Sequence, residues 1–437
     1  MPRASHCFSR QFQVQRLQKL FEEKLIGARA VGVDGISLEK FQSNIEREVE
    51  IISRKALGGT YRFSAFKAKF ISKGHSSPPR VISIATIRDK LSLRALFEVL
   101  REVYPDCITS KPHSYVSEVR AFCRAASKES VFLRVDIRDF YVSIEVDKLM
   151  KILSRRVRKK EILVLIEGAL RTKTEGFTRG VPQGLSISNI LANLYLSDFD
   201  REMRQKFAYF RYVDDILFIL PDEKVAETAY SLVRRKLKGK YSLVCHDLGK
   251  NEKSTISKIE DGIDYLGYRI SLGKTKVKDK SVKQFIGRLF KLLYRYAKSN
   301  QSASALWRLN LRISGCRFNG RYRGWVHFFQ QIDDVKQLVR IDAFILKTLR
   351  ELNISIDHSR IKKITRAFYE AKYNSEATVY IPNFDQYTVP QMAEMIARIR
   401  GISIDAVFGS RKTVEEQFRD VLSRELVDLE TDLLLFS

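Results

Sequence analysis

The chain has 437 residues, 44% of them hydrophobic, and its 78 lysines and arginines outnumber 51 aspartates and glutamates, giving a net charge of +27. This apolar content excludes a disordered tail and is enough for a core divided among two or three domains. Residues 375–437 hold 6 basic and 11 acidic residues, so they carry −5 and residues 1–374 carry +32; such a basic body indicates a polyanionic partner, most often nucleic acid, with a solvated basic surface as the alternative.

The cysteines and the apolar runs indicate the cellular compartment. Five scattered cysteines form no CxxC pair, which favours a reducing compartment over a disulfide framework. The adjacent pairs His6-Cys7 and Cys245-His246 lack the other two ligands of a zinc site and are interpreted as ordinary residues. No apolar run approaches the roughly 20 residues of a membrane span, and the N-terminus has no apolar signal core. We therefore expect a cytoplasmic protein that does not enter a membrane.

The first half of the chain alternates between helical and strand patterns. Apolar residues at helical spacing predict helix over 12–55, interrupted at 31–35. Alternation over 61–84, around the turn-rich GHSSPP, predicts a basic β-hairpin. The patterns then predict helix over 89–103, a strand over 131–137 that ends in an acid, and helix over 145–171.

The second half begins with the Gly- and Pro-marked GFTRGVPQG and a helix through SNILANLYLSDFD. The run FAYFRYVDDILFIL predicts two strands that meet at a tight turn near Val213 and Asp214. A helix over 222–238 and strands over 241–246 and 264–271 complete an α+β unit. Basic helices follow from Val282 to Arg366, and acidic amphipathic helices follow a charge boundary near residue 374.

Two adjacent carboxylates, Asp214 and Asp215, stand inside an otherwise apolar run, where each loses water and repels the other. A third acid, Asp136, ends the strand over 131–137. If that strand pairs beside the 209–220 hairpin, the three carboxylates converge, and hard oxygen ligands suit Mg²⁺. Two such ions can promote in-line phosphoryl displacement. The alternative is a pair of acids that merely caps the turn.

Three segments resemble the central palm motifs of reverse transcriptases: YVDD (212–215), VDIRDFYVSI (135–144) and GVPQGLSISNILANLYL (180–196). Further segments at 32–41, 80–100, 243–255 and 264–270 are similar to bacterial group II intron and retron-type enzymes, and 306–345 resembles the maturase thumb. The resemblance implies a right-hand polymerase, α+β, with fingers, an antiparallel palm sheet, a helical thumb and a helical C-terminal extension. The expected divisions are an N-terminal helical extension (1–60), fingers and palm (61–275), thumb (276–374) and acidic extension (375–437).

The resemblance also assigns the catalytic residues. Asp136, Asp214 and Asp215 would bind two Mg²⁺ ions, with the main-chain carbonyl of Ile137 as an additional ligand. Lys253, with Lys250 as an alternative, would donate a proton to the leaving pyrophosphate.

For the incoming deoxynucleotide, Tyr141 would exclude a 2′-hydroxyl, or else be plain core. Lys73 and Arg80 would grip the triphosphate, with solvated surface as the alternative. Gln183 and Gly184 would line the nucleotide pocket.

For the template-primer duplex, Arg321, Arg323 and Trp325 join basic and aromatic groups in one stretch. Trp325 is equally explained as helix-packing core.

The chain departs from the group II pattern in the GLSISN segment and in the lack of Cys or His pairs after residue 316. Together with the acidic tail, this resembles the bacterial reverse transcriptases of abortive infection and defence, which implies antiphage defence with a non-coding RNA. The expected partners are an RNA template, the DNA product and dNTPs, with a homo-oligomer or companion protein through the extension. Untemplated or protein-primed synthesis by the same site, and a non-catalytic maturase-like RNA scaffold, remain alternatives.

Overall fold

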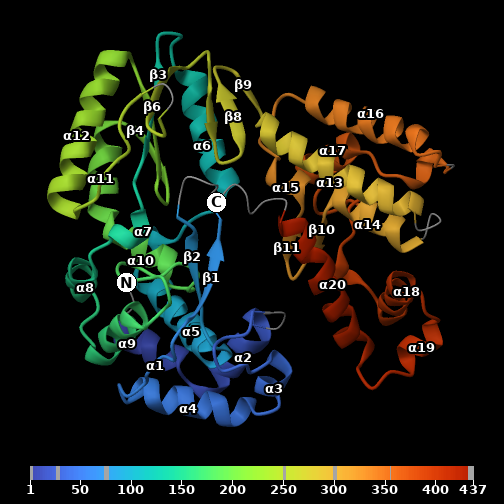
Figure 1. Cartoon of the computed structure of the whole chain (residues 1–437), viewed down its shortest axis with the longest axis horizontal. Coiled ribbons are helices and arrows are strands. Elements are labelled where there is room, and N and C mark those ends of the chain that lie inside the picture. Colours follow the sequence, from blue (N-terminus) through green and yellow to red (C-terminus); the bar gives the residue numbers. More distant parts are fainter. Residues whose placement is uncertain are drawn as a thin grey trace. The chain divides into compact units, whose positions relative to one another are not determined.

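The computed structural model describes residues 3–25, 30–72, 78–249, 252–298, 303–354 and 356–431. The chain forms two compact units (Figure 1). The first comprises residues 1–110 and 129–257, and the second comprises 111–128 and 258–437. Both contain helices and strands, which confirms the α+β class. The division into fingers, palm, thumb and extension is a functional one that stays a prediction.

The helices of the first unit enclose one large apolar core. In chain order, the helices of this unit are α1 (Ala4–Gln11), α2 (Val14–Lys24), α3 (Leu38–Gln42), α4 (Ile45–Leu57), α5 (Ile87–Val103), η1 (Pro105–Cys107), α7 (Phe140–Ser143), α8 (Val146–Ser154), α9 (Lys160–Arg171), α10 (Ser188–Tyr195), α11 (Ser197–Lys206) and α12 (Glu223–Tyr241).

A four-stranded sheet of order β4-β5-β3-β6 is built on that core. Its strands are β3 (Val131–Asp136), β4 (Ala208–Tyr212), β5 (Asp215–Leu220) and β6 (Thr255–Lys258). The central strands β3 and β5 are antiparallel, and β4 and β5 form the expected hairpin. In Figure 1, α11 and α12 lie beside this sheet; α12 contacts β3 and β5, and α11 contacts β4. Nearly every residue of β5 is buried, so the strand that carries the second of the paired acids is held firmly on both faces.

The predicted basic hairpin is present as β1 (Lys67–Ile71) and β2 (Arg80–Ile84). Lys73, predicted at its tip, lies outside the described residues, as does Lys250.

The second unit consists mainly of helices with two small sheets. Its sheets are β7-β8-β9 and β10-β11. Its elements are α6 (Pro112–Ala125), β7 (Ile263–Tyr265), β8 (Tyr268–Ser271), β9 (Lys274–Val277), α13 (Asp279–Lys298), α14 (Ala303–Ser314), β10 (Cys316–Phe318), β11 (Arg321–Arg323), α15 (Trp325–Phe328), α16 (Lys336–Glu351), η2 (His358–Arg360), α17 (Ile364–Tyr373), η3 (Phe384–Gln386), α18 (Val389–Arg400), α19 (Ile404–Phe408) and α20 (Val414–Thr431).

The acidic C-terminal helices pack on α14 and the β10-β11 hairpin through a core of their own. Leu311, Cys316 and Phe318 meet Phe384, Phe418 and the apolar faces of α18 and α20 there. The segment after residue 374 is therefore part of the second unit, although its charge is opposite.

Three sequence predictions differ from the structure, and one helix was missed. The strand expected over 241–246 is wrong: α12 continues to Tyr241, Ser242 is left-handed with φ 55°, and only Cys245 forms a bridge, to Ile137. The helix expected over 145–171 is two helices. The strand expected over 264–271 is the β7-β8 hairpin, whose turn residues Leu266 and Gly267 both have positive φ. The helix α6 was not predicted.

No helix in the described part of the chain is both long and apolar enough to cross a membrane.

Candidate active site

The pairing of β3 with β5 brings the three predicted acids together. Asp136, the last residue of β3, lies directly opposite Asp215, the first residue of β5. Asp214 occupies the two-residue turn that joins β4 to β5. The Ile137 amide donates a hydrogen bond to the Asp214 main-chain carbonyl over 3.3 Å, which ties the end of β3 to that turn. The predicted convergence of the acids is thus present in the strand register.

The turn that contains Val213 and Asp214 is strained. Val213 has φ 60°, a left-handed conformation that is unfavourable for a β-branched residue. Strain of this kind costs about 1 to 3 kcal/mol and persists only where the surroundings impose it. The contacts that impose this conformation also hold Asp214 beside the ends of the two strands.

A buried ion pair imposes the turn. Arg211 is 5% exposed. Its Nη1 donates to the Val213 carbonyl over 2.7 Å and its Nε donates to Asp200 over 2.7 Å. The Tyr209 hydroxyl donates to the same Asp200 carboxylate over 2.6 Å. Asp200 comes from α11, so this network connects the helix, β4 and the turn.

Burial makes the two adjacent acids hard to ionise. Burial raises the pKa of Asp214, and repulsion from Asp136 adds to it, while the charges of Arg80 and Lys253 oppose the rise. Burial also raises the pKa of Asp215, to about 6, although Arg134 opposes it. Clustered acids with raised pKa values are typical of sites that receive a cation or a proton.

Arg134 binds both oxygens of Asp215. Its Nε and Nη2 donate to Oδ1 and Oδ2, each over 2.8 Å. Arg134 lies two residues before Asp136 on β3, so the two side chains share one face of the sheet. This arginine supplies positive charge on the same side as the three carboxylates.

Asp136 has its own polar neighbours. His246 Nε2 lies 3.2 Å from Asp136 Oδ2, and the Lys253 Nζ lies 3.5 Å from the same oxygen. Burial lowers the pKa of His246, and Lys253 lowers it further, so the imidazole is neutral at pH 7. The Asp136 amide donates to the Ser254 hydroxyl over 3.3 Å. Lys253 is therefore beside the acids, and its side chain is 67% exposed.

The donor set fits a divalent cation, although no group of three or more His, Cys, Asp and Glu side chains in the described segments forms a ready cage for one. Asp136 and Asp214 offer hard oxygen donors, and a cation between them would remove their repulsion. Asp215 is the acid whose oxygens are already bound, by Arg134.

The residues predicted for the nucleotide lie in the same unit. The Tyr141 hydroxyl donates to Asn189 Oδ1 over 2.6 Å, and burial raises the pKa of Tyr141, with Asp214 contributing. Arg80 begins β2 and is exposed. The Gln183 carbonyl accepts from the Ser83 amide over 2.7 Å, which docks the Gly-Pro loop onto the β1-β2 hairpin.

The backbone around position 184 leaves no room for a side chain, which explains the glycine there. Its φ is +100°, and a Cβ there would lie 2.7 Å from Ile82 Cγ2 and 2.8 Å from the Ser83 carbonyl. Its contact with a nucleotide remains a prediction.

The predicted nucleic-acid-binding residues lie in the second unit. Arg321 and Arg323 are on β11, with Arg321 exposed. Trp325 is 1% exposed and stacks on Phe285 with ring centroids 4.6 Å apart. The placement of Trp325 favours the alternative that it is helix-packing core.

Sequence reasoning missed the residues that surround the acids: Arg134, Asp200, Arg211 and His246. Two signals were available. Arg134 and Arg211 are charged residues inside otherwise apolar strands, where an unpaired charge is costly, so a buried acid was to be expected beside each. His246 was interpreted as an ordinary residue, and nothing in its local sequence indicates Asp136.

Part of the chain matches a known protein family. Residues 71–270, just under half of the chain, match the family described as "Reverse transcriptase (RNA-dependent DNA polymerase)". The chain is 22% identical over 300 residues to Protein YkfC of Escherichia coli (strain K12), covering 56% of this chain and 76% of that protein. It is 23% identical over 205 residues to the group II intron-encoded protein LtrA of Lactococcus lactis subsp. cremoris, covering 44% of this chain and 33% of that protein.

Among solved structures, a telomerase from Candida albicans in complex with a fragment of telomeric RNA matches with a TM-score of 0.41 and 14% identity, over 91% of this chain and 67% of that chain.

Proposed function

We propose that this chain, an RNA-dependent DNA polymerase by the family of its residues 71–270, adds deoxynucleotides at Asp136, Asp214 and Asp215. The observation that carries the proposal is the register of β3 and β5, which sets Asp136 opposite Asp215 with Asp214 in the adjoining turn. The proposed architecture is a right hand with fingers and palm over 61–275, a thumb over 276–374 and a C-terminal extension over 375–437.

Asp136, Asp214 and Asp215, with the carbonyl of Ile137, are proposed to hold two Mg²⁺ ions. Asp215 would have to exchange its hydrogen bonds with Arg134 for such an ion. Bound at these residues, the ions would supply activation of the attacking hydroxyl and positive charge beside the transferred phosphoryl group. The raised pKa of Asp214 supports this assignment, because a site that disfavours two carboxylate charges favours a cation between them.

Lys253 is proposed to donate a proton to the leaving pyrophosphate. Its ammonium lies 3.5 Å from Asp136 and is largely exposed, so it can swing to a substrate. Arg80, with Lys73, is proposed to bind the triphosphate, and the influence of Arg80 on Asp214 supports its closeness to the acids.

Tyr141 is proposed to exclude ribonucleotides by filling the space of a 2′-hydroxyl. The hydrogen bond to Asn189 fixes its ring, which supports a steric role. Tyr141→Ala is expected to raise the incorporation of ribonucleotides relative to deoxynucleotides by about tenfold or more, whereas Tyr141→Phe keeps the ring and the discrimination. Single-nucleotide extension with matched dNTP and rNTP measures the ratio; equal ratios for all three proteins would contradict the role.

Arg321 and Arg323 are proposed to contact the phosphates of the duplex. For the extension, the exposed apolar side chains of Ile402, Ile404 and Phe408 support a surface for a second copy or a companion protein. Light scattering measures the molar mass of the purified protein, with and without its RNA, and so tests whether a second copy binds.

The cellular role is proposed to be antiphage defence with a non-coding RNA template. The support is the PQGLSIS segment together with the acidic helical extension. Phage plating on cells that express the wild type or Asp214→Ala/Asp215→Ala tests it; equal plating on both contradicts the role without touching the polymerase proposal.

The product of the reaction tests the polymerase proposal. The wild type is purified with its bound RNA, given Mg²⁺ and dNTPs without a primer, and both RNA and product are sequenced. DNA complementary to the bound RNA supports templated synthesis, and DNA with no complement supports untemplated synthesis by the same site. If the protein makes no DNA, with or without an added primer-template, but still binds RNA, the polymerase proposal is wrong. A non-catalytic RNA-binding scaffold is then the better explanation.

A further inference from the structure

Asn193, on α10, joins segments that are far apart in the chain. Its Nδ2 donates to the Cys107 carbonyl over 3.0 Å and to the Thr109 hydroxyl over 2.9 Å, at and just after the end of η1. Its Oδ1 accepts from Arg211 Nη1 on β4 over 3.1 Å. A carbonyl only accepts and a guanidinium only donates, so a single orientation of the amide satisfies both partners. The amide oxygen is therefore held towards β4.

Arg211 connects Asn193 to the turn that carries Asp214. The same Nη1 donates to the Val213 carbonyl over 2.7 Å, while Nε and Nη2 bind the two oxygens of Asp200 on α11. The pair with Asp200 is buried and bidentate, which fixes the plane of the guanidinium. The position of the Val213 carbonyl is thus set by a group that two helices hold.

This carbonyl belongs to the peptide that joins Val213 to Asp214. Val213 has φ 60°, which a β-branched residue leaves unless its surroundings prevent it. Relaxation of Val213 would rotate this peptide and move the Asp214 side chain with it. The hydrogen bond from Arg211 opposes that rotation.

The helix that carries Asn193 is itself anchored in the site. Ser188, its first residue, donates to the Pro182 carbonyl of the Gly-Pro loop. Asn189, one turn before Asn193, accepts from the Tyr141 hydroxyl over 2.6 Å. One helix therefore contacts the loop, the tyrosine proposed to select deoxynucleotides and the arginine behind the turn.

We propose that Arg211 and Asn193 are positioning residues for the polymerase reaction: they hold the strained turn so that Asp214 stands near Asp136 before a divalent cation binds. Both act through the main chain of Val213. This inference rests on the proposed function, because it assumes that Asp214 is a ligand of the cation. It predicts that cation affinity falls when the contact with the turn is lost, although every carboxylate remains.

The test compares the full-length wild type with Arg211→Lys and with the control Tyr209→Phe. Lysine keeps the charge beside Asp200, but one ammonium cannot replace the planar fork that binds Asp200 and the Val213 carbonyl together. Tyr209→Phe removes a 2.6 Å hydrogen bond from the same Asp200 and leaves the contact with Val213 in place. Both variants disturb the buried acid, and only Arg211→Lys disturbs the turn.

A second variant, Asn193→Leu, keeps the pair of Arg211 with Asp200 and removes the amide that supports Arg211. It decides the question alone against Tyr209→Phe if Arg211→Lys does not fold, which circular dichroism shows.

Mn²⁺ serves as the probe, and electron paramagnetic resonance measures its free concentration without nucleotides or nucleic acid. Arg211→Lys is expected to bind Mn²⁺ about 10- to 100-fold more weakly than the wild type, and Asn193→Leu about tenfold more weakly. Tyr209→Phe should stay within about twofold of the wild type. The Mg²⁺ concentration that gives half-maximal primer extension should rise by the same factors.

The variant Asp214→Asn separates the two possible failures. If it binds Mn²⁺ as tightly as the wild type, Asp214 is not a ligand, and the proposed function fails together with this inference. If Asp214→Asn loses Mn²⁺ while folded Arg211→Lys and Asn193→Leu bind it as Tyr209→Phe does, the inference alone is overturned.

Discussion

Asp215 differs from the other two acids because its carboxylate is bound by an arginine of the neighbouring strand. Arg134 makes two hydrogen bonds to it, yet the pKa of Asp215 still stands at about 6 because the carboxylate is buried. Arg134 therefore stabilises a charge that the site otherwise opposes, and it must yield if Asp215 is to bind a cation.

Replacing Arg134 with Gln should destabilise the metal-free protein by about 2 kcal/mol at pH 8. The reason is that Asp215 is then buried and ionised without a partner. A carboxyl whose pKa is raised on folding stabilises the protein at low pH, and this stabilisation is lost as pH rises through the folded pKa of about 6. The variant should thus approach the wild type at pH 5, as urea unfolding in EDTA would measure.

Arg138→Gln is the matched control, since Arg138 pairs with Asp247 over 2.9 Å with both side chains exposed. It should cost less than about 1 kcal/mol at either pH. A loss for Arg134→Gln that is no larger than this, or that does not depend on pH, would show that the pair with Asp215 is unimportant.

At the scale of elements, the site depends on how the Gly-Pro loop docks against the β1-β2 hairpin. The Ser83 amide donates to Gln183, and Gly184 lies so close to β2 that no side chain fits. Gly184→Ala should destabilise the protein by about 2 to 4 kcal/mol, because the added Cβ meets Ile82 and the Ser83 carbonyl at a positive φ.

Gly239→Ala is the contrasting variant. Gly239 lies inside α12, and a Cβ there meets nothing within 4 Å. It should stabilise the protein by about 0.5 to 1 kcal/mol through helix propensity. Thermal denaturation of the two variants tests the prediction; a stable Gly184→Ala protein would mean that the loop does not dock this closely.

The sequence was most informative for elements with a strong local pattern. Alternation predicted the β1-β2 hairpin, and a continuous apolar run predicted the β4-β5 hairpin and the strand that ends at Asp136. The strand expected over 241–246 is wrong because burial alternates there without a strand. Tyr241, at the end of α12, and Leu243, in the loop that follows, are both buried, and this produces the same apolar alternation as a strand. Arg134 and His246 were missed because their partners lie 81 and 110 residues away in the chain, and only the folded register brings them together.

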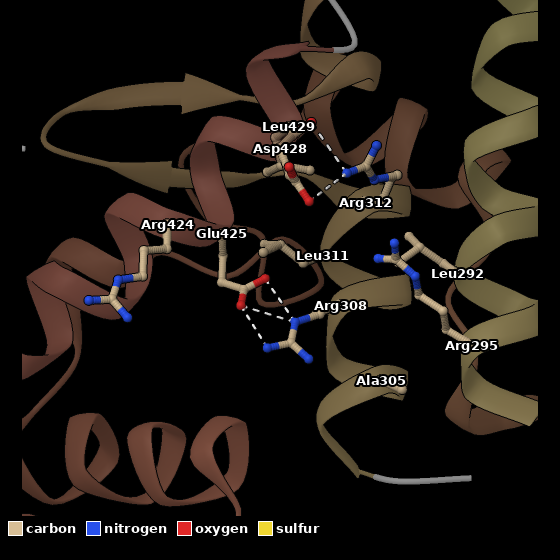
Figure 2. Close-up of a pocket in the computed structure, with 10 residues that line it drawn as sticks. All are labelled: Leu292, Arg295, Ala305, Arg308, Leu311, Arg312, Arg424, Glu425, Asp428 and Leu429. Atoms are coloured by element: carbon tan, nitrogen blue, oxygen red, sulfur yellow. Dashed lines mark hydrogen bonds and ion pairs between the residues drawn. The ribbon is translucent and has the colours of Figure 1, made fainter. Parts of the chain in front are cut away.

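The whole molecule combines a basic body with an acidic C-terminal segment that folds onto basic helices. Residues 375–437 carry −5 and the remainder +32, and Arg308 and Arg312 of α14 pair with acids of α20. This contact, drawn in Figure 2, neutralises part of the positive charge of the second unit within the protein.

The second unit should lose stability in acid because of one buried histidine. His327 is 5% exposed, and burial lowers its pKa to about 4, against 6.5 in the unfolded chain. A base whose pKa falls on folding stabilises the protein above the unfolded pKa, and this stabilisation is lost as pH falls towards the folded pKa. Between pH 6.5 and 4 the loss should reach about 3 kcal/mol.

His327→Phe should remove that pH dependence, and His6→Phe in the first unit should keep it. Urea unfolding between pH 7 and 4 measures the difference. Parallel pH profiles for the wild type and His327→Phe would exclude His327 as the cause.

The most direct measurement for the central claim is single-turnover extension of a DNA primer on a defined RNA template with Mg²⁺ and dNTPs. Asp136→Asn, Asp214→Asn and Asp215→Asn are compared with the wild type and with Asp106→Asn, an exposed acid of the same unit. We expect the wild type and Asp106→Asn to extend the primer at the same rate, and each of the other three to be slower by at least about a hundredfold. Extension by Asp136→Asn and Asp214→Asn at the wild-type rate would contradict the assignment of the active site.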